Sequence, residues 1–214
     1  MYYNRNDMSE LAVLGNTPVN YSILESLYPG YKSPYSKIAA LEKAGCIIRL
    51  KKGMYVVAPR ESGKLLSMEL IANHLYGPSY ISRETALRYY GLIPEAVYLT
   101  RSMTTKHSRS FENAIGHFEY TSCSTDYFPI GIRQNTQGEI SFLIASPEKA
   151  LCDVICYTAG LGLRFRKELY AYLEEDLRFD MDMLHSMDIS VIERCAEVGK
   201  KTTTLNNLIK LIRK

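Results

Sequence analysis

The chain has no tryptophan, no long apolar run and no C-x-x-C pair. A membrane-spanning helix needs about 20 consecutive apolar residues, so the sequence predicts no transmembrane segment. The first ten residues, MYYNRNDMSE, also lack the apolar stretch of a secretory signal peptide. We therefore expect a cytoplasmic protein with no membrane partner.

The residues that usually build metal and disulfide sites are few and scattered. The four histidines form no H-E-x-x-H motif, no Cys/His ligand set has zinc-site spacing, and no glycine-rich phosphate loop is present. Five cysteines are an odd number, and in a reducing compartment we expect free thiols in the core. The sequence predicts no metal, no cofactor and no enzyme.

One acidic segment deserves comparison with a nuclease site. Glu148, Lys149 and Asp153 lie close together in the sequence, but a metal nuclease needs several convergent carboxylates to hold its ions. Asp153 follows Lys149 by four residues, a spacing that predicts an ion pair on a helix. An enzyme acting on nucleic acid remains the least favoured alternative.

What the sequence does contain is a helix signal between Tyr31 and Gly45. Ser33 is a candidate N-cap, and Pro34 fits the first helical position, where its missing N–H costs nothing. Ile38 and Leu41 form a narrow apolar seam. Small, polar and basic residues fall on another side of the helix: Ser36, Lys37, Ala40 and Lys43.

A β-hairpin is predicted directly after this helix. Apolar residues alternate with Arg49 and Lys51, Lys52-Gly53 makes a turn, and Met54–Val57 returns as a second strand. Two earlier helices are expected over Met8–Leu14 and Tyr21–Tyr28. Short helices followed by a hairpin with a cationic tip are typical of a winged helix-turn-helix.

This chemistry suits double-stranded DNA. A helix fits the major groove, and cations of the hairpin contact phosphates. Residues 1–60 hold eight Lys/Arg and four Asp/Glu, a net charge of +4; the whole chain is +3, so the remaining residues sum to −1. The residues expected to contact DNA are Lys32, Ser33, Ser36, Lys37, Ala40, Arg49, Lys51 and Lys52. A winged-helix adaptor that binds a protein partner, without sequence-specific DNA binding, remains the alternative.

The rest of the chain predicts a second, mixed α+β domain. We place the boundary near residue 60, so that residues 1–60 form the winged helix and 61–214 the larger domain, with a small sheet over about 79–146 and helices over about 147–214. Strands are expected over 80–82, 96–100, 114–121, 127–132 and 140–145. The polar segment 101–110 is expected to be an exposed loop. Its cations are a possible second basic surface for nucleic acid or a phosphorylated partner: Arg101, Lys106 and Arg109.

Three blocks of the sequence resemble a known family. YSKIAALEKAGCIIRLKKGMYVV is similar to the winged helix of AbiEi-type antitoxins. GPSYISRETALRYYGLIPE resembles that family's strand, capped helix and G-L-I-P/E turn, and SFLIASPEKALCDVI resembles its strand followed by an x-P-x-K-A-L-x-D helix. The order and spacing of the blocks match over most of the chain, although the tail KKTTTLNNLIKLIRK departs from the pattern.

The resemblance implies an antitoxin of a type IV toxin–antitoxin system, which acts in abortive infection. In that family the winged helix binds inverted repeats in its own promoter and represses the operon, so two copies on the DNA are expected. The larger domain is associated with counteracting a nucleotidyltransferase-like toxin, without direct contact being general. The positions that correspond to the family's recognition helix and wing are Ser33, Ser36, Lys37, Ala40, Arg49, Lys51 and Lys52.

Overall fold

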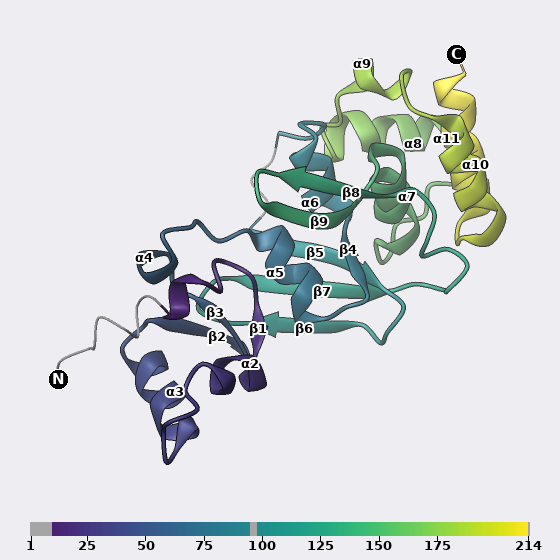
Figure 1. The fold of residues 1–214 in the computed structure, drawn as a ribbon. Coiled ribbons are helices and arrows are strands. Elements are labelled where there is room, and N and C mark those ends of the chain that lie inside the picture. Colours follow the sequence, from purple (N-terminus) through teal and green to yellow (C-terminus); the bar gives the residue numbers. More distant parts are fainter. Residues whose placement is uncertain (1–9, 95–97, 214) are drawn as a thin grey trace.

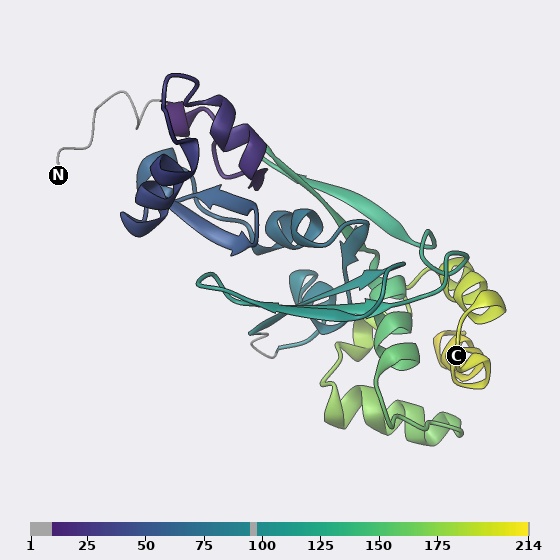
Figure 2. The same ribbon diagram turned by 90° about the horizontal axis from the view of Figure 1, so that it is seen from below.

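The chain is a mixed α+β protein with two β-sheets (Figure 1). The computed structural model describes residues 10–94 and 98–213. A small N-terminal unit lies at one end of the molecule, a six-stranded sheet occupies the middle, and the C-terminal helices gather at the other end (Figures 1 and 2). No helix in the described ranges is long and apolar enough to cross a membrane.

The N-terminal unit confirms the predicted helix and hairpin. Its elements are β1 (Val19–Asn20), α2 (Tyr21–Ser26), α3 (Pro34–Lys43), β2 (Ile47–Lys51) and β3 (Met54–Val57). The strands form an antiparallel sheet in the order β1-β3-β2. Of the helix expected over Met8–Leu14, Met8 lies outside the described residues, and residues 10–12 are helical.

The β2–β3 hairpin is shared between two hydrophobic cores. One face, with Ile47, Tyr55 and Val57, packs with the small core of the N-terminal unit. The opposite face carries Leu50 and Val56, which belong to the core of the rest of the chain. Because side chains alternate across a strand, one ribbon serves both cores. The hairpin therefore joins the two units as well as ending the first.

The second unit is built on a mixed sheet in the order β6-β7-β5-β4-β9-β8. Its strands are β4 (Ser79–Ile81), β5 (Leu99–Thr104), β6 (Arg109–Glu112), β7 (His117–Ser122), β8 (Ile132–Gln137) and β9 (Ile140–Ala145). The helices before and between them are α4 (Pro59–Ser62), α5 (Met68–Leu75) and α6 (Arg83–Tyr89). The short helix α4 occupies the segment that we expected to be the boundary.

Two predictions for this sheet are wrong. Residues 127–132 were expected to be a strand but form turns, and β8 starts only at Ile132. Residues 101–110 were expected to be an exposed loop, but 101–104 lie in the central strand β5 and only 105–108 connect it to β6. Thr104 of β5 donates to the carbonyl of Pro78 at 2.8 Å, whereas the buried hydroxyl of Ser102 has no hydrogen-bond partner among the described residues. Of the strand expected over 96–100, residues 96 and 97 lie outside the described ranges.

The C-terminal third is helical, as predicted. It comprises α7 (Pro147–Tyr157), α8 (Arg166–Ala171), a π-helical turn η1 (Tyr172–Asp176), α9 (Met181–Leu184), α10 (Ile189–Val198) and α11 (Thr202–Ile212). Asp188 caps α10 through its carboxylate, which accepts from the N–H of Ser190. The short helix α9 was not predicted.

Candidate nucleic-acid interface

Helix α3 has the start and the buried seam that the sequence predicts. The Ser33 hydroxyl accepts a hydrogen bond from the N–H of Ser36, and Pro34 occupies the first turn. Ile38 and Leu41 are buried in the small core. The cap and the seam fix which face of α3 points outward.

The outward face of α3 is formed by small, polar and basic side chains. Ser36, Ala39 and Lys43 are exposed there. The single acidic residue of α3, Glu42, accepts from Arg49 of β2 at 2.6 Å. This ion pair offsets the negative charge that would repel a phosphate backbone, and it ties the helix to the hairpin.

The predicted DNA-facing residues of this helix and its approach differ in exposure. Exposed are Lys32, Ser33 and Ser36, whereas Lys37 and Ala40 are half-buried. The Lys37 ammonium lies 4.9 Å from the ring centroid of Tyr31 and 5.3 Å from that of Tyr28. Stacking over two rings positions this charge beside the start of α3.

The three hairpin cations do not form one exposed cluster. Arg49 is paired with Glu42, and its guanidinium lies 5.7 Å from the ring centroid of Tyr55. Lys51 turns toward the second unit, where its ammonium donates to the carbonyl of Leu75 at the end of α5. Arg49 and Lys52 are both exposed, and of the three only Lys52 lies in the turn at the tip.

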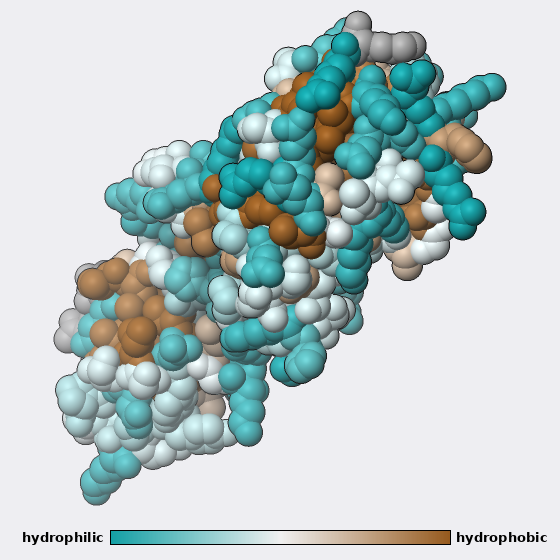
Figure 3. All heavy atoms as spheres, turned by 90° about the vertical axis from the view of Figure 1, so that its right-hand side faces the viewer, coloured by the Kyte–Doolittle hydropathy of each residue, from teal (hydrophilic) through white to brown (hydrophobic). Residues whose placement is uncertain are grey.

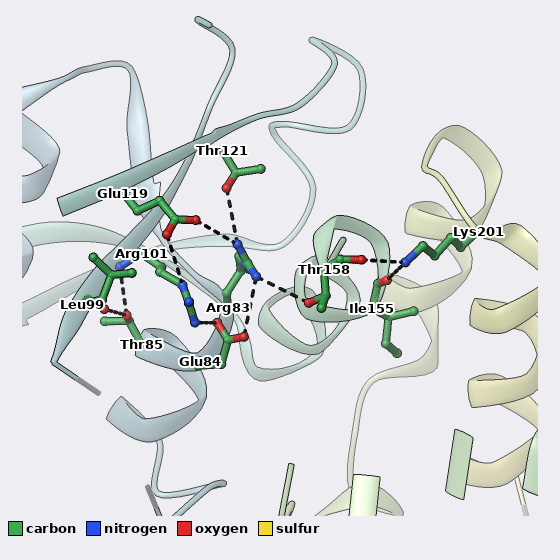
Figure 4. A network of polar contacts seen from close by, with 10 residues as sticks. All are labelled: Arg83, Glu84, Thr85, Leu99, Arg101, Glu119, Thr121, Ile155, Thr158 and Lys201. Carbon is green, nitrogen blue, oxygen red and sulfur yellow. Dashed lines mark hydrogen bonds and ion pairs between the residues drawn. The ribbon is translucent and has the colours of Figure 1, made fainter. Parts of the chain in front are cut away.

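The predicted second basic surface is also divided. Lys106 and Arg109 are exposed, whereas Arg101 is half-buried on β5. Arg101 pairs with Glu84 at 2.8 Å and lies 3.7 Å from Glu119, in the network drawn in Figure 4. Arg101 is therefore part of an internal ion-pair network.

Lys106 and Arg109 instead meet the hairpin cations in one cavity, which we call the junction pocket. It has a volume of about 420 Å³ and lies between the hairpin tip, the end of α5 and the β5–β6 connection. Its lining residues are Lys51, Lys52, His74, Tyr76, Gly77, Lys106, Arg109 and Phe111. None of these described lining residues is acidic, and the sequence analysis did not foresee that the two basic segments converge.

Sequence reasoning also missed Arg83, the centre of the network in Figure 4. Arg83 is buried, with a φ of +55°, and its guanidinium lies 3.3 Å from Glu119 and 3.6 Å from Glu84. It also donates to Thr158, which links α6 to the end of α7. Opposite charges alternate through the network, so we infer that its role is to stabilise the packing of α6 against β7 and the end of α7.

The Lys149–Asp153 pair is confirmed, but it is wholly internal. The Lys149 ammonium lies 3.1 Å from the Asp153 carboxylate, and both side chains are 0% exposed. Tyr80 and Ser82 donate to the same carboxylate at 3.1 and 2.6 Å. Ser82 occupies the N-cap position of α6, yet its hydroxyl donates to Asp153 instead of capping the helix.

The five cysteines are free and buried. Within residues 10–94 and 98–213, no group of three or more His, Cys, Asp or Glu side chains is placed to hold a metal ion.

A second cavity of about 970 Å³ opens between the ends of β7 and α7 and the start of α11. Serine and threonine hydroxyls line much of it. The ammonium of Lys201, at one side, donates to the carbonyls of Ile155 and Thr158, and that of Lys200 lies 5.0 Å from the ring centroid of Tyr157. Its cations face carbonyls and a ring, and no second basic segment joins them.

Exposed hydrophobic side chains are spread over the molecule. They range along the chain from Val13 to Val198, and on the face drawn in Figure 3 the hydrophobic surface is divided by polar and charged side chains. Two of them, Tyr31 and Tyr35, lie at the start of α3 and are 46% and 70% exposed.

Comparison with known proteins supports the fold alone. No protein-family model matches the chain, and no curated protein matches it. Among solved structures, the chain is similar to the RV2827C protein from Mycobacterium tuberculosis, with a TM-score of 0.63 and 14% sequence identity. The likeness covers 97% of this chain and 75% of that one.

Proposed function

We propose that this chain is a DNA-binding antitoxin that represses its own operon. In this proposal β1, α2, α3, β2 and β3 act as a winged helix, and α3 enters the major groove. The observation that carries the proposal is the outward face of α3: Ser36, Ala39 and Lys43 are exposed, and the only acid of that helix is paired with Arg49.

Charge supports the same assignment. The net charge of +4 on residues 1–60 attracts the phosphate backbone, whereas the remainder of the chain is −1. The partner expected from the resemblance is the inverted-repeat DNA of its own promoter, bound by two copies. The second unit is then the part that counteracts a nucleotidyltransferase-like toxin.

A titration with promoter DNA tests the repressor half of the proposal. Fluorescence anisotropy compares about 150 base pairs of upstream DNA with a scrambled duplex at two salt concentrations. We expect preference for the upstream DNA and steep weakening by salt, because each neutralised phosphate releases counterions. Equal binding of both duplexes at both salt concentrations would contradict the proposal.

Substitutions on α3 separate base reading from charge. Ser36→Ala should change the preference among operator variants by about 0.5–1.5 kcal/mol, because it removes one hydroxyl from the face that meets the bases. Lys43→Ala should weaken all sequences alike. Lys167→Ala is the matched control, since it removes one exposed lysine from α8 at the other end of the chain.

A growth assay tests the antitoxin half. The neighbouring gene is induced with and without this chain, and rescue of growth is scored. A Ser36→Glu/Lys43→Glu variant should lose DNA binding and keep rescue, because both changes lie outside the second unit. Loss of rescue in a variant that folds normally would place the neutralising surface on α3 instead.

The adaptor function remains a second candidate. Tyr31 and Tyr35 are exposed beside α3, and tyrosine is enriched at protein interfaces. An adaptor would show no preference for promoter DNA, and Tyr35→Ala would weaken a protein complex without changing the salt dependence of DNA binding.

A further inference from the structure

We propose that the junction pocket is a binding site for a phosphate group. The site joins the hairpin tip to the second unit and takes the phosphate of a phosphodiester or a phosphoanhydride. The DNA backbone as its source rests on the function proposed above, whereas a free pyrophosphate or nucleotide as its source does not.

Positive charge from separate parts of the chain converges on the junction pocket. Lys51 and Lys52 come from the hairpin tip, and Lys106 and Arg109 come from the β5–β6 segment more than 50 residues later. The described lining contains no carboxylate to balance them. Four like charges around one cavity repel each other, and an anion removes that repulsion.

The cations of the pocket are positioned without being neutralised. Lys51 and Lys106 donate to the carbonyls of Leu75 and Gly77, which bear no net charge. The guanidinium of Arg109 lies 4.9 Å from the ring centroid of Phe111. Carbonyls and rings hold these side chains in place while leaving their full charge in the pocket.

The electrostatics of Lys51 agree with this geometry. Partial burial lowers its pKa, and the positive charges of Lys106 and Arg109 lower it further. A phosphate would act in the opposite direction on the same group.

A purely structural role accounts for only part of the site. Lys51 and Lys106 satisfy carbonyls at and just after the end of α5, which is a common use of lysine. That role does not explain why Lys52 is exposed on the rim of the pocket, or why the guanidinium of Arg109 lies over the rings of Tyr76 and Phe111 in the same pocket. These two residues are therefore the ones to change.

The composition of the site favours phosphate as the ligand. Arginine presents a planar fork that matches phosphate oxygens, and lysine adds point charges. The rings of Tyr76 and Phe111, inclined at 55° to each other, give the same cavity an aromatic lining for a sugar or base attached to the phosphate. A volume of about 420 Å³ is larger than a single phosphate needs.

The test uses the full chain with Lys52→Ala/Arg109→Ala and a matched control, Arg166→Ala/Lys167→Ala. Both double variants remove two exposed positive charges, and the control residues lie on α8. Lys51 and Lys106 stay in place, so the end of α5 keeps its hydrogen bonds. Circular dichroism verifies that both variants fold.

Two measurements distinguish the sources of phosphate. For DNA, the negative slope of the logarithm of the binding constant against the logarithm of salt concentration should become shallower by about one to two units in the pocket variant and stay unchanged in the control. For a free anion, pyrophosphate at 100 times its Kd and constant ionic strength should raise the melting temperature of the wild type by about 5–10 °C and leave the pocket variant unchanged.

Either response alone supports the site and names its source. If neither measurement separates the pocket variant from the control, the phosphate site is refuted. Failure of the repressor function gives a different pattern, in which promoter DNA is not preferred and α3 variants have no effect. The pyrophosphate arm still judges the pocket in that case.

Discussion

Replacing Asp153 by asparagine is the sharpest test of how the second unit is stabilised. Asparagine has nearly the same shape and still offers an oxygen to Tyr80 and Ser82, which now donate to the carboxylate. What the change removes is the negative charge beside the Lys149 ammonium, at 3.1 Å and with no solvent exposure on either side. The substitution therefore isolates the ion pair.

Breaking a buried ion pair costs about 3–5 kcal/mol, because one charge remains in the interior without a partner. For a chain of this length that corresponds to a fall in melting temperature of about 6–20 °C. Lys149→Met/Asp153→Asn removes both charges, leaves no unpaired charge in the interior, and should therefore cost less than the single change. A cost of about 1–3 kcal/mol remains, because the carbonyl of Tyr127 loses the hydrogen bond that Lys149 donates.

Urea unfolding followed by circular dichroism gives the free energies by linear extrapolation. Glu193→Gln is the control, since it removes one carboxylate from an exposed pair with Arg213 and should cost less than about 1 kcal/mol. The reasoning is refuted if Asp153→Asn costs no more than this control, or if the double variant is less stable than the single one.

Two further outcomes follow from burial and backbone geometry. Burial raises the pKa of the Cys123 and Cys156 thiols to about 12, so native protein at pH 8 should react with a disulfide reagent far more slowly than unfolded protein. Because the folded-state pKa lies above the ordinary value of 9, deprotonation of these thiols favours the unfolded chain. Their contribution to the free energy of unfolding is therefore fully present below pH 9 and declines as pH rises toward 12. Gly131→Ala should destabilise the protein by about 1–3 kcal/mol, because φ is +62° and the added Cβ would lie 2.8 Å from the Cβ of Lys149. Gly138→Ala is the control and should cost less, because its φ of +59° is similar but the space around it is open. Equal melting temperatures for the two variants would contradict this prediction.

Features encoded by local pattern were predicted well. The cap at Ser33, the seam of Ile38 and Leu41 and the turn at Lys52-Gly53 all depend on residues within a few positions of each other. The helix and the hairpin therefore follow from the sequence alone, and so does the ion pair between Lys149 and Asp153.

What failed depends on contacts across the chain. Residues 101–104 look like a polar loop because partners such as Glu84 and Glu119 of Arg101 and the Pro78 carbonyl of Thr104 lie 17 to 26 residues away. Arg83 directly follows the N-cap position of α6, and nothing in its sequence neighbours indicates a positive φ or a hydrogen bond to the end of α7. The junction pocket was invisible for the same reason, since its two basic segments meet only in the fold.

The shared hairpin has a consequence for how such a protein can be cut or recombined. A fragment ending near residue 60 would leave Leu50 and Val56 facing water, although both are now at most 2% exposed. The carbonyl of Leu50 would also lose the hydrogen bond that Asn113 donates to it. A chimaera that exchanges the N-terminal unit for that of another protein must therefore carry matching apolar residues on this face of the hairpin, and a unit grafted without them should aggregate.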